Sequence, residues 1–236
     1  MKKFNFNLLE LVLVIAVFFI MSGIIIPIFA EQKEDSDATL CMNRKKQLLA
    51  AITSYANDNN GQFVAWENSK PYTVFFVKGK YIDNKVNEIS CPLVKNLHLD
   101  QDVIAANGNY TVASRAAFGV VRNIKDIAWR DYYKRDVYRP RNAKSSGQYD
   151  SAINFLNIGN KILLGDTALK TDGTAFAAFG AMGNQADAAM GIYVHGDSNI
   201  IGWTDGHVEA MTPAQFKAEN PFARKYMKTD LKLYDF

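Results

Sequence analysis

An uncharged apolar run, LVLVIAVFFIMSGIIIPIFA, occupies residues 11–30. In helical form, about twenty apolar residues match the ~30 Å hydrocarbon core of a bilayer. Lys2 and Lys3 precede the run, and the positive-inside tendency keeps that end in the cytoplasm. The pattern therefore predicts a membrane-spanning helix, with everything from Glu31 onward outside the membrane.

A cleavable secretory signal is an alternative explanation of the same run. The string IPIFA before Glu31 offers a small residue at a plausible cut, and a secreted hydrolase would then begin at Glu31. A signal has an apolar core of about 7–15 residues and rarely contains an acid. The length of the run and the presence of Glu10 favour the membrane-spanning helix.

A second pattern follows the apolar run and indicates that the helix continues. Five residues recur at steps of three and four, the spacing of one helical face: Cys41, Lys45, Leu48, Ile52 and Tyr55. The stem of the one lysine can lie along apolar surface. The string NDNNG, residues 57–61, predicts the helix end, with Gly61 in a left-handed conformation.

Short apolar runs separated by polar turns fill the rest of the chain and predict a globular head. The string PYTVFFVKGKYI, residues 71–82, predicts a short helix or strand, and ILL, residues 162–164, predicts a strand after a turn. With the long helix, these runs indicate an α+β protein.

The clearest local signal is a hairpin at residues 199–211. Asp205 and Gly206 suit the central positions of a type I′ turn. In that register Thr204 faces His207, while three further cross-strand pairs follow: Trp203–Val208, Gly202–Glu209 and Ile201–Ala210. Trp203, Ile201, Val208 and Ala210 would then share one face.

Composition excludes several classes of function. The formal net charge is +3 and only two cysteines occur, Cys41 and Cys91. Two cysteines are too few for a disulfide scaffold, and their separation does not fit the C-x-x-C pairs of zinc sites. The string WRDYYKRDVYRPRN, residues 129–142, mixes basic and aromatic residues as single-strand nucleic-acid binders do. Asp131 and Asp136 interrupt the charge, so we favour a solvated edge or loop over a nucleic-acid partner.

Candidate metal ligands gather in the string VHGDSNIIGWTDGHVEAM, residues 194–211. His195, Asp197, Asp205 and His207 could together hold a divalent ion such as calcium. A structural role is favoured, because Asp205 in a tight turn naturally accepts backbone amides, and His195 could bond across to that turn. The sequence has no G-x-S-x-G or H-E-x-x-H motif, so neither a cofactor nor an enzymatic activity is predicted.

The string KKFNFNLLELVLVIAVFFIMSGIIIPIF resembles the amino terminus of type IV prepilins and type II secretion pseudopilins. The resemblance implies that prepilin peptidase removes the leader between Asn5 and Phe6 and that Phe6 is methylated. It also implies that Glu10 pairs with the terminal amine of a neighbouring subunit during assembly. The chain departs from the family pattern at Asn5, where the family has glycine.

The other end of the chain resembles the same broad family. His195, nine intervening residues and then Asp205 and Gly206, followed by His207, resemble the prepilin-type processing-associated domain. The helix from Cys41 to Tyr55 and the Cys91-Pro92 pair are also similar to segments of prepilin-like proteins. In an oxidising space Cys41 and Cys91 could form a disulfide; two buried free thiols are the alternative.

Together these patterns predict an α+β, pilin-like protein. Its long N-terminal helix would have a membrane-spanning half and an amphipathic half, packed on an antiparallel β-sheet head. The predicted segments are a leader (1–5), a transmembrane half (6–30), an amphipathic half (31–60) and a head (61–236).

The predicted function is that of a filament subunit of a type IV pilus or secretion pseudopilus. Its partners would be prepilin peptidase, other pilin or pseudopilin subunits and the bacterial inner membrane, with the head extracytoplasmic. The alternative is a membrane-tethered module that binds carbohydrate, DNA or a surface partner and does not polymerise.

Overall fold

The computed structural model describes residues 8–67, 70–96, 100–105, 111–115, 117–121, 138–141, 150–154, 159–179, 189–221 and 223–236. The predicted cleavage residues, Asn5 and Phe6, lie outside these ranges. The chain divides into two compact units, Met1–Asp37 and Ala38–Phe236.

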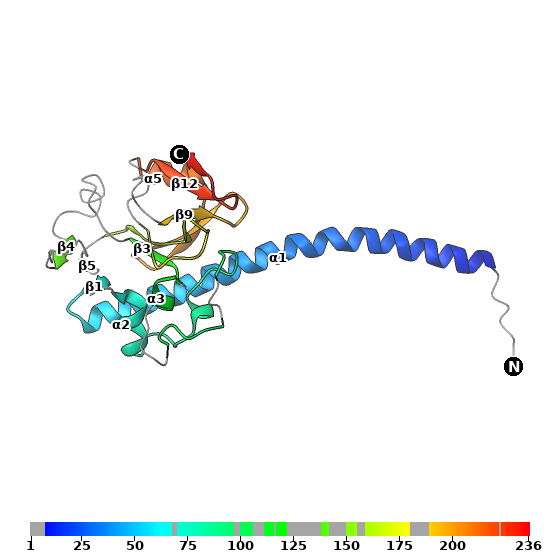
Figure 1. The fold of residues 1–236 in the computed structure, drawn as a ribbon. Coiled ribbons are helices and arrows are strands. Elements are labelled where there is room, and N and C mark those ends of the chain that lie inside the picture. Colours follow the sequence, from blue (N-terminus) through cyan, green and yellow to red (C-terminus); the bar gives the residue numbers. More distant parts are fainter. Residues whose placement is uncertain are drawn as a thin grey trace. The chain divides into compact units, whose positions relative to one another are not determined.

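The first element, α1, is a 51-residue helix from Leu8 to Asp58 (Figure 1). In its second part, Cys41, Lys45, Leu48 and Ile52 are buried, and Tyr55 is partly buried. The predicted amphipathic face is therefore confirmed. The burial of Lys45 is complete and includes its ammonium group, so more than its stem lies in the core.

The predicted end of α1 is also confirmed. Gly61 has a φ of +76°, and its N–H donates to the carbonyl of Ala56 at 2.7 Å. This left-handed glycine satisfies a carbonyl of the last turn and reverses the chain into the first strand.

The membrane-spanning half of the predicted fold is not found. Within the described part of the chain, no helix is both long and apolar enough to cross a bilayer. The fold-class prediction is corrected on this point.

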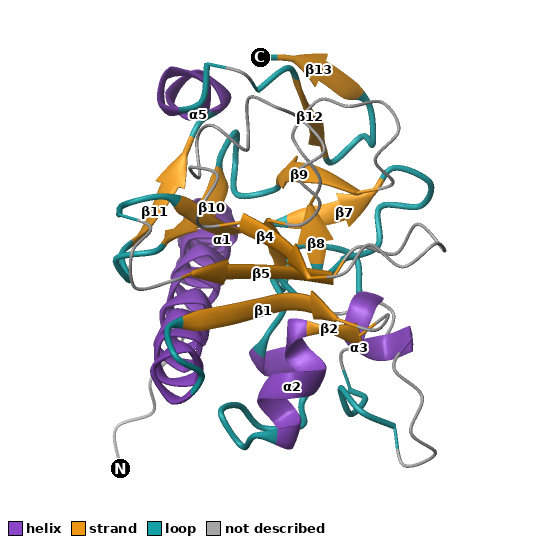
Figure 2. Ribbon diagram, turned by 90° about the vertical axis from the view of Figure 1, so that its left-hand side faces the viewer, coloured by secondary structure: helices purple, strands orange, loops and turns teal. Residues whose placement is uncertain are grey.

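The described strands of the second unit form three sheets (Figure 2). The first has the order β2-β1-β5-β4 and comprises β1 (Gln62–Glu67), β2 (Lys70–Pro71), β4 (Tyr138–Arg141) and β5 (Asp150–Asn154). The second has the order β11-β10-β6-β3-β8 and comprises β3 (Gly119–Val121), β6 (Ile162–Gly165), β8 (Ala178–Phe179), β10 (Asn199–Trp203) and β11 (Val208–Met211). The third has the order β13-β12-β9-β7 and comprises β7 (Thr167–Leu169), β9 (Ala189–Tyr193), β12 (Lys225–Lys228) and β13 (Leu233–Asp235).

A single antiparallel sheet was predicted, and this too is corrected. Strands β3 and β8 pair in parallel, as do β9 and β12, while the other pairs are antiparallel. Parallel partners need a long crossover, and long segments separate both pairs in the sequence. Local apolar runs predict strands, but they carry no information on such distant pairing.

Short helices complete the fold: α2 (Tyr72–Lys78), the 3₁₀ turn η1 (Val86–Glu88), α3 (Thr111–Arg115) and α5 (Pro213–Glu219). The predicted helix-or-strand segment at 71–82 thus forms a helix, α2. Thr212 begins α5 with a capping box, since its side chain and that of Gln215 each accept the other's backbone amide, and such caps stabilise a helix start. In Figure 2, α2 and α3 lie beside β1 and β2, while α5 lies near β11.

The second half of α1 packs closely on β10 because of a glycine. A Cβ placed on Gly202 would lie 3.1 Å from Leu49 Cδ1 and 3.2 Å from Leu164 Cβ. The side chain of Leu49 belongs to α1 and that of Leu164 to the neighbouring strand β6. Because Gly202 has no side chain, the side chains of α1 can pack directly on the backbone of β10.

Replacing Gly202 by valine is expected to lower the free energy of unfolding by about 1–3 kcal/mol, the usual range for overpacking a core. Ala210→Val is the matched control, since it adds a comparable side chain on the exposed part of β11 and should change stability by less than about 0.5 kcal/mol. Urea unfolding followed by circular dichroism measures both. Equal effects of the two variants would show that the close approach at Gly202 does not limit packing.

Candidate functional site

The hairpin at the end of the second sheet differs by one residue from the predicted register. Ile200 pairs with Ala210 and Gly202 with Val208, whereas Ile201–Ala210 was predicted. Gly206 has a φ of +93° and its N–H donates to the carbonyl of Trp203. The loop is thus a three-residue turn closed by a positive-φ glycine, the next most common hairpin connection after two-residue loops.

Burial along β10 also differs from the prediction. All of Asn199–Trp203 is buried, whereas alternation between an apolar and a polar face was predicted. Strand β10 lies between β11 and β6, so neighbouring strands cover both of its edges, and Leu49 of α1 lies against Gly202. The polar residue Asn199 is buried as well, because it hydrogen-bonds to Asp166.

The predicted role of Asp205 is found in the turn. Its carboxylate accepts the backbone N–H of His207 at 3.1 Å and lies 2.6 Å from His207 Nδ1. His207 Nε2 lies 3.4 Å from Glu209 Oε1, and its ring stacks on Trp203. The side chains of Asp205, His207 and Glu209 are about half exposed, and their contacts with one another stabilise the turn.

The remaining candidates of this stretch lie elsewhere. Asp197 forms an exposed ion pair with Lys228 at 2.8 Å. His195 and Ser198 exchange both backbone hydrogen bonds around a two-residue turn, in which Gly196 has a φ of +61°. The four predicted metal candidates are therefore divided, with His195 separated from Asp205 and His207.

The imidazole of His195 lies in a buried polar cluster instead of reaching the predicted turn. His195 Nε2 is 3.3 Å from Cys91 Sγ and 3.5 Å from Asp166 Oδ2. Its side chain is 3% exposed, and its Nδ1 has no hydrogen-bond partner among the described residues. The histidine of the sequence motif is thus a core residue.

The charged centre of this cluster is an ion pair between Lys45 of α1 and Asp166. Lys45 Nζ lies 2.6 Å from Asp166 Oδ1, and both side chains are 0% exposed. The ammonium also donates to the carbonyl of Ile200 at 2.5 Å and lies 4.6 Å from the centroid of the Phe118 ring. A buried charge needs several such partners to offset the loss of water.

Asp166 is held in place by reciprocal hydrogen bonds with Asn199. The backbone N–H of Asp166 donates to Asn199 Oδ1, and Asn199 Nδ2 donates to the carbonyl of Asp166, both at 2.9 Å. Asp166 lies in the single-residue gap between β6 and β7. Its Oδ2 accepts the N–H of Ile200 at 3.1 Å, so the carboxylate also satisfies a backbone donor near the start of β10.

The two cysteines complete the cluster. Cys41 Sγ lies 3.4 Å from Asp166 Oδ1 and 3.4 Å from Lys45 Nζ. Cys41 and Cys91 are both buried free thiols, the alternative left open beside a disulfide. The donor atoms of Cys41, Cys91, Asp166 and His195 all lie within 4.8 Å of one another.

The electrostatic environment of the cluster favours opposite charges on its lysine and its acid. Burial opposes ionisation of Asp166, but Lys45 and His195 outweigh it and lower the pKa of the carboxyl to about 2. Burial also opposes the charge of Lys45, yet Asp166 and the thiols raise its pKa. Hydrogen bonding to Asp166 and Cys41 outweighs burial and raises the pKa of His195 to about 9. Burial is the main cause of the raised pKa of Cys41.

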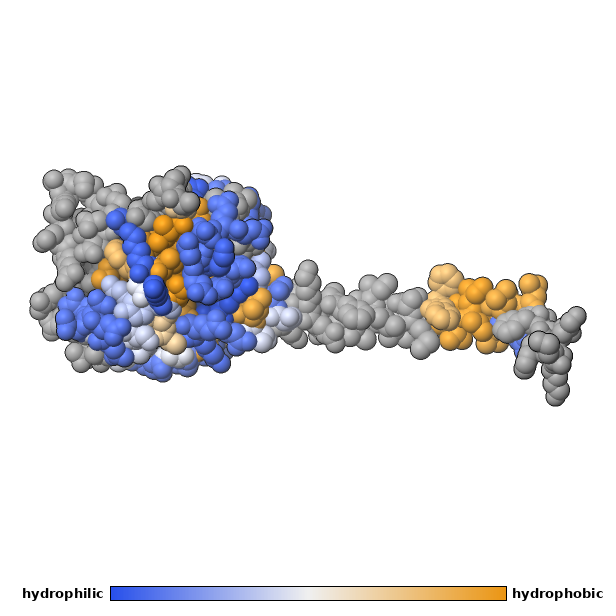
Figure 3. Space-filling view, turned by 90° about the horizontal axis from the view of Figure 1, so that it is seen from below, coloured by the Kyte–Doolittle hydropathy of each residue, from blue (hydrophilic) through white to orange (hydrophobic). Residues whose placement is uncertain are grey.

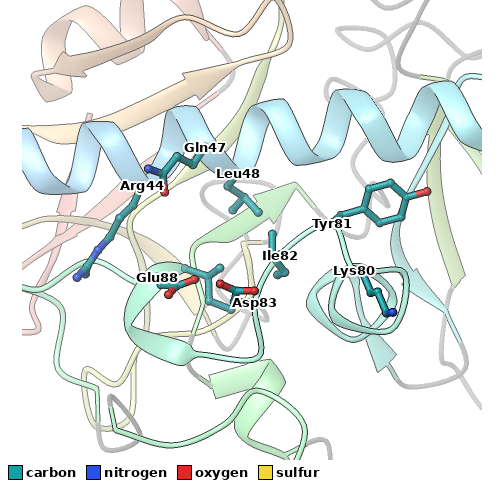
Figure 4. Close-up of a pocket in the computed structure, with 9 residues that line it drawn as sticks. Arg44, Gln47, Leu48, Lys80, Tyr81, Ile82, Asp83 and Glu88 are labelled. Carbon is teal, nitrogen blue, oxygen red and sulfur yellow. The ribbon is translucent and has the colours of Figure 1, made fainter.

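A separate surface pocket of about 250 Å³ lies between α1 and the segment 80–89. Figure 4 shows its lining, in which the basic Arg44 and Lys80 accompany the acidic Asp83 and Glu88. Arg44 Nη1 donates to the carbonyl of Ser90 at 2.9 Å. The pocket has charges of both signs and points to no ligand class.

The first unit presents a different kind of surface. Along α1 from Leu8 to Phe19, large apolar side chains are exposed, and Phe18 and Phe19 are 72% and 75% exposed. Figure 3 shows this part of the helix as hydrophobic surface. Glu10 lies in the first turn of the helix.

No family model, curated protein or solved structure matches this chain. The similarity to prepilins therefore stays a prediction from the quoted motifs.

Lys45 and Asp166 were not among the predicted site residues. The signal for Lys45 was its place on an otherwise apolar helical face, and the signal for Asp166 was an acid between two apolar strands in ILLGDTAL. Both signals say that a charge is buried. Neither says that the two charges meet.

Proposed function

We propose that the protein is a structural subunit of a filament like a type IV pilus or a type II secretion pseudopilus. The observation that carries the proposal is the exposed apolar surface of α1 between Leu8 and Phe19. Contiguous apolar surface of this kind on a protein marks an interaction site. In the proposed assembly, the same segment of other copies covers it.

The energetic argument rests on the size of the exposed side chains. Burying one large aliphatic or aromatic side chain stabilises by about 1.5–3 kcal/mol. The segment offers the following such residues: Leu8, Leu9, Leu11, Val12, Leu13, Val14, Ile15, Val17, Phe18 and Phe19. Because they surround the helix and do not form a single stripe, one partner helix cannot cover them, and a bundle of several helices can.

The motifs at both ends of the chain support identical copies as the partners. In the resembled family, prepilin peptidase exposes a new amine at the position of Phe6, and the acid at the position of Glu10 meets the amine of a neighbour. The second unit has its own hydrophobic core, so it can serve as the head of a subunit. The proposed partners are prepilin peptidase and other pilin or pseudopilin subunits.

A charge in the apolar segment is expected to abolish assembly. Leu11→Asp should reduce the sheared filament fraction at least tenfold, since a carboxylate buried without a partner costs several kcal/mol and 1.4 kcal/mol is about tenfold in an equilibrium. Leu40→Asp is the matched control, because Leu40 lies on the same helix and is 40% exposed, against 47% for Leu11. Both variants are produced in a host with prepilin peptidase and scored by immunoblot and electron microscopy.

Both leucines are exposed, so neither substitution should disturb the head, which circular dichroism checks. Filament yield of Leu11→Asp equal to that of the unmodified chain would contradict the proposal. A chain that stays monomeric and instead binds a carbohydrate or surface partner would favour the alternative function.

A further inference from the structure

The cluster around Asp166 holds the donor atoms of a zinc site. Cys41 comes from α1, Cys91 follows η1, Asp166 separates β6 from β7, and His195 follows β9. Thiolate sulfur, imidazole nitrogen and carboxylate oxygen are the ligands that zinc takes in proteins, and structural sites have four of them. Here four such donors converge in the core from four parts of the chain.

Two separations within the cluster match the edges of a tetrahedral zinc site. With metal–ligand distances of about 2.0–2.3 Å, the ligand atoms of a tetrahedral zinc site lie about 3.3–3.8 Å apart. The observed separations are 3.3 Å for Cys91 Sγ to His195 Nε2 and 3.5 Å for His195 Nε2 to Asp166 Oδ2, and the donor atoms of all four residues lie within 4.8 Å of one another. A direct charge-assisted hydrogen bond between histidine and carboxylate is shorter, about 2.7–2.9 Å.

The charges also balance. Two thiolates, one carboxylate and a neutral imidazole around a divalent ion carry a net charge of −1. Lys45, 2.6 Å from Asp166 and completely buried, brings the set to zero. A neutral buried cluster avoids most of the cost of removing ions from water.

We propose that Cys41, Cys91, Asp166 and His195 bind a structural zinc ion, with Lys45 as the neutralising cation. Asp166 coordinates through Oδ2 and keeps its Oδ1 contact with Lys45. Binding to the reduced protein replaces one proton on each thiol and the extra proton of the protonated His195 ring, so that the ion forms two zinc–sulfur bonds, one zinc–nitrogen bond and one zinc–oxygen bond while three protons leave. Because the ligands are buried, the ion enters while the chain folds. The site fastens α1 to the sheets and does not depend on filament assembly.

The test uses the full chain, produced with zinc and purified under reducing conditions. Elemental analysis is expected to find stoichiometric zinc, and EDTA is expected to lower the Tm. His195→Ala should lose at least nine-tenths of the bound zinc, whereas the control His207→Ala should keep it, since His207 lies on the exposed hairpin. When the metal-free protein is unfolded and refolded with cobalt, it should show the near-ultraviolet absorption of thiolate–cobalt bonds, a readout that needs no variant.

Two outcomes would overturn the proposal. One is a reduced protein that folds in the presence of zinc or cobalt and retains neither metal in stoichiometric amount. The other is a chain purified without reductant whose intact mass is lower by two hydrogens and whose denatured form has no reactive thiol. That result would show a disulfide between Cys41 and Cys91 in place of the metal.

Discussion

Replacing Lys45 by methionine is expected to lower the free energy of unfolding of the metal-free, reduced protein by about 3–5 kcal/mol, the usual cost of breaking a buried ion pair from one side. Methionine fills a similar volume, so the loss comes from charge and hydrogen bonding. The carboxylate of Asp166 would stay buried without its 2.6 Å partner. The carbonyl of Ile200 would also lose a donor.

The reciprocal variant, Asp166→Asn, removes the negative charge but keeps an oxygen that can accept the N–H of Ile200. It leaves the ammonium of Lys45 buried without a counter-ion and is expected to cost a similar amount. The double variant Lys45→Met/Asp166→Asn removes both charges. We expect it to be more stable than either single variant, because no unpaired charge stays in the core.

Urea unfolding of the four proteins in EDTA and reductant measures this cycle. If the losses of unfolding free energy in the two single variants add up in the double variant, the two charges do not interact. The ion pair would then not stabilise the core. A control pair is available at the surface, where Lys85 and Asp102 lie 2.7 Å apart and are half exposed. Replacing that pair should change stability by less than about 1 kcal/mol.

The helical face of α1 shows why part of the fold could be predicted. Cys41, Leu48 and Ile52 are spaced by the helix itself, and Gly61 ends the helix through local backbone geometry. Both signals lie within a few residues of the structure that they predict. The same is true of α2 and β6, which the apolar runs located.

The buried cluster could not be predicted in the same way. Lys45 and Asp166 are separated by 121 residues and Cys91 and His195 by 104, so no spacing rule relates them. The sequence argued against zinc because its two cysteines do not form a C-x-x-C pair. In the folded chain, the four proposed ligands instead come together from a helix, two turns and the gap between two strands.

The hairpin shows an intermediate case. Its position was predicted, but the register was wrong by one residue, because Asp205 and Gly206 were placed at both central positions of a two-residue turn. Gly206 instead closes a three-residue loop with a φ of +93°. The two-residue turn lies at Gly196 and Asp197, one hairpin earlier. Glycine after an acid favours both geometries, so the local sequence alone does not decide between them.

Removing the charge of Glu10 is the second large effect that we expect. Glu10 lies in the first turn of α1, within the exposed apolar segment. In the proposed filament, neighbouring helices enclose this segment, and the amine of a processed neighbour supplies the opposite charge. Glu10→Gln keeps the size of the side chain but not its charge, and it should lower filament incorporation at least tenfold. Glu219→Gln, an exposed acid of α5, is the matched control and should have no effect.

The reason for the expected loss distinguishes charge pairing from simple helix packing. If pairing with the amine of Phe6 matters, acetylation or failed cleavage of that terminus should cause the same loss as Glu10→Gln, and the two changes together should add little more. Mass spectrometry of the mature terminus shows which form is present, and mixed expression with the unmodified chain measures incorporation. If Glu10→Gln is incorporated as well as the unmodified chain, while Leu11→Asp is not, the ion pair has no part in assembly. The filament would then be held together by apolar contacts.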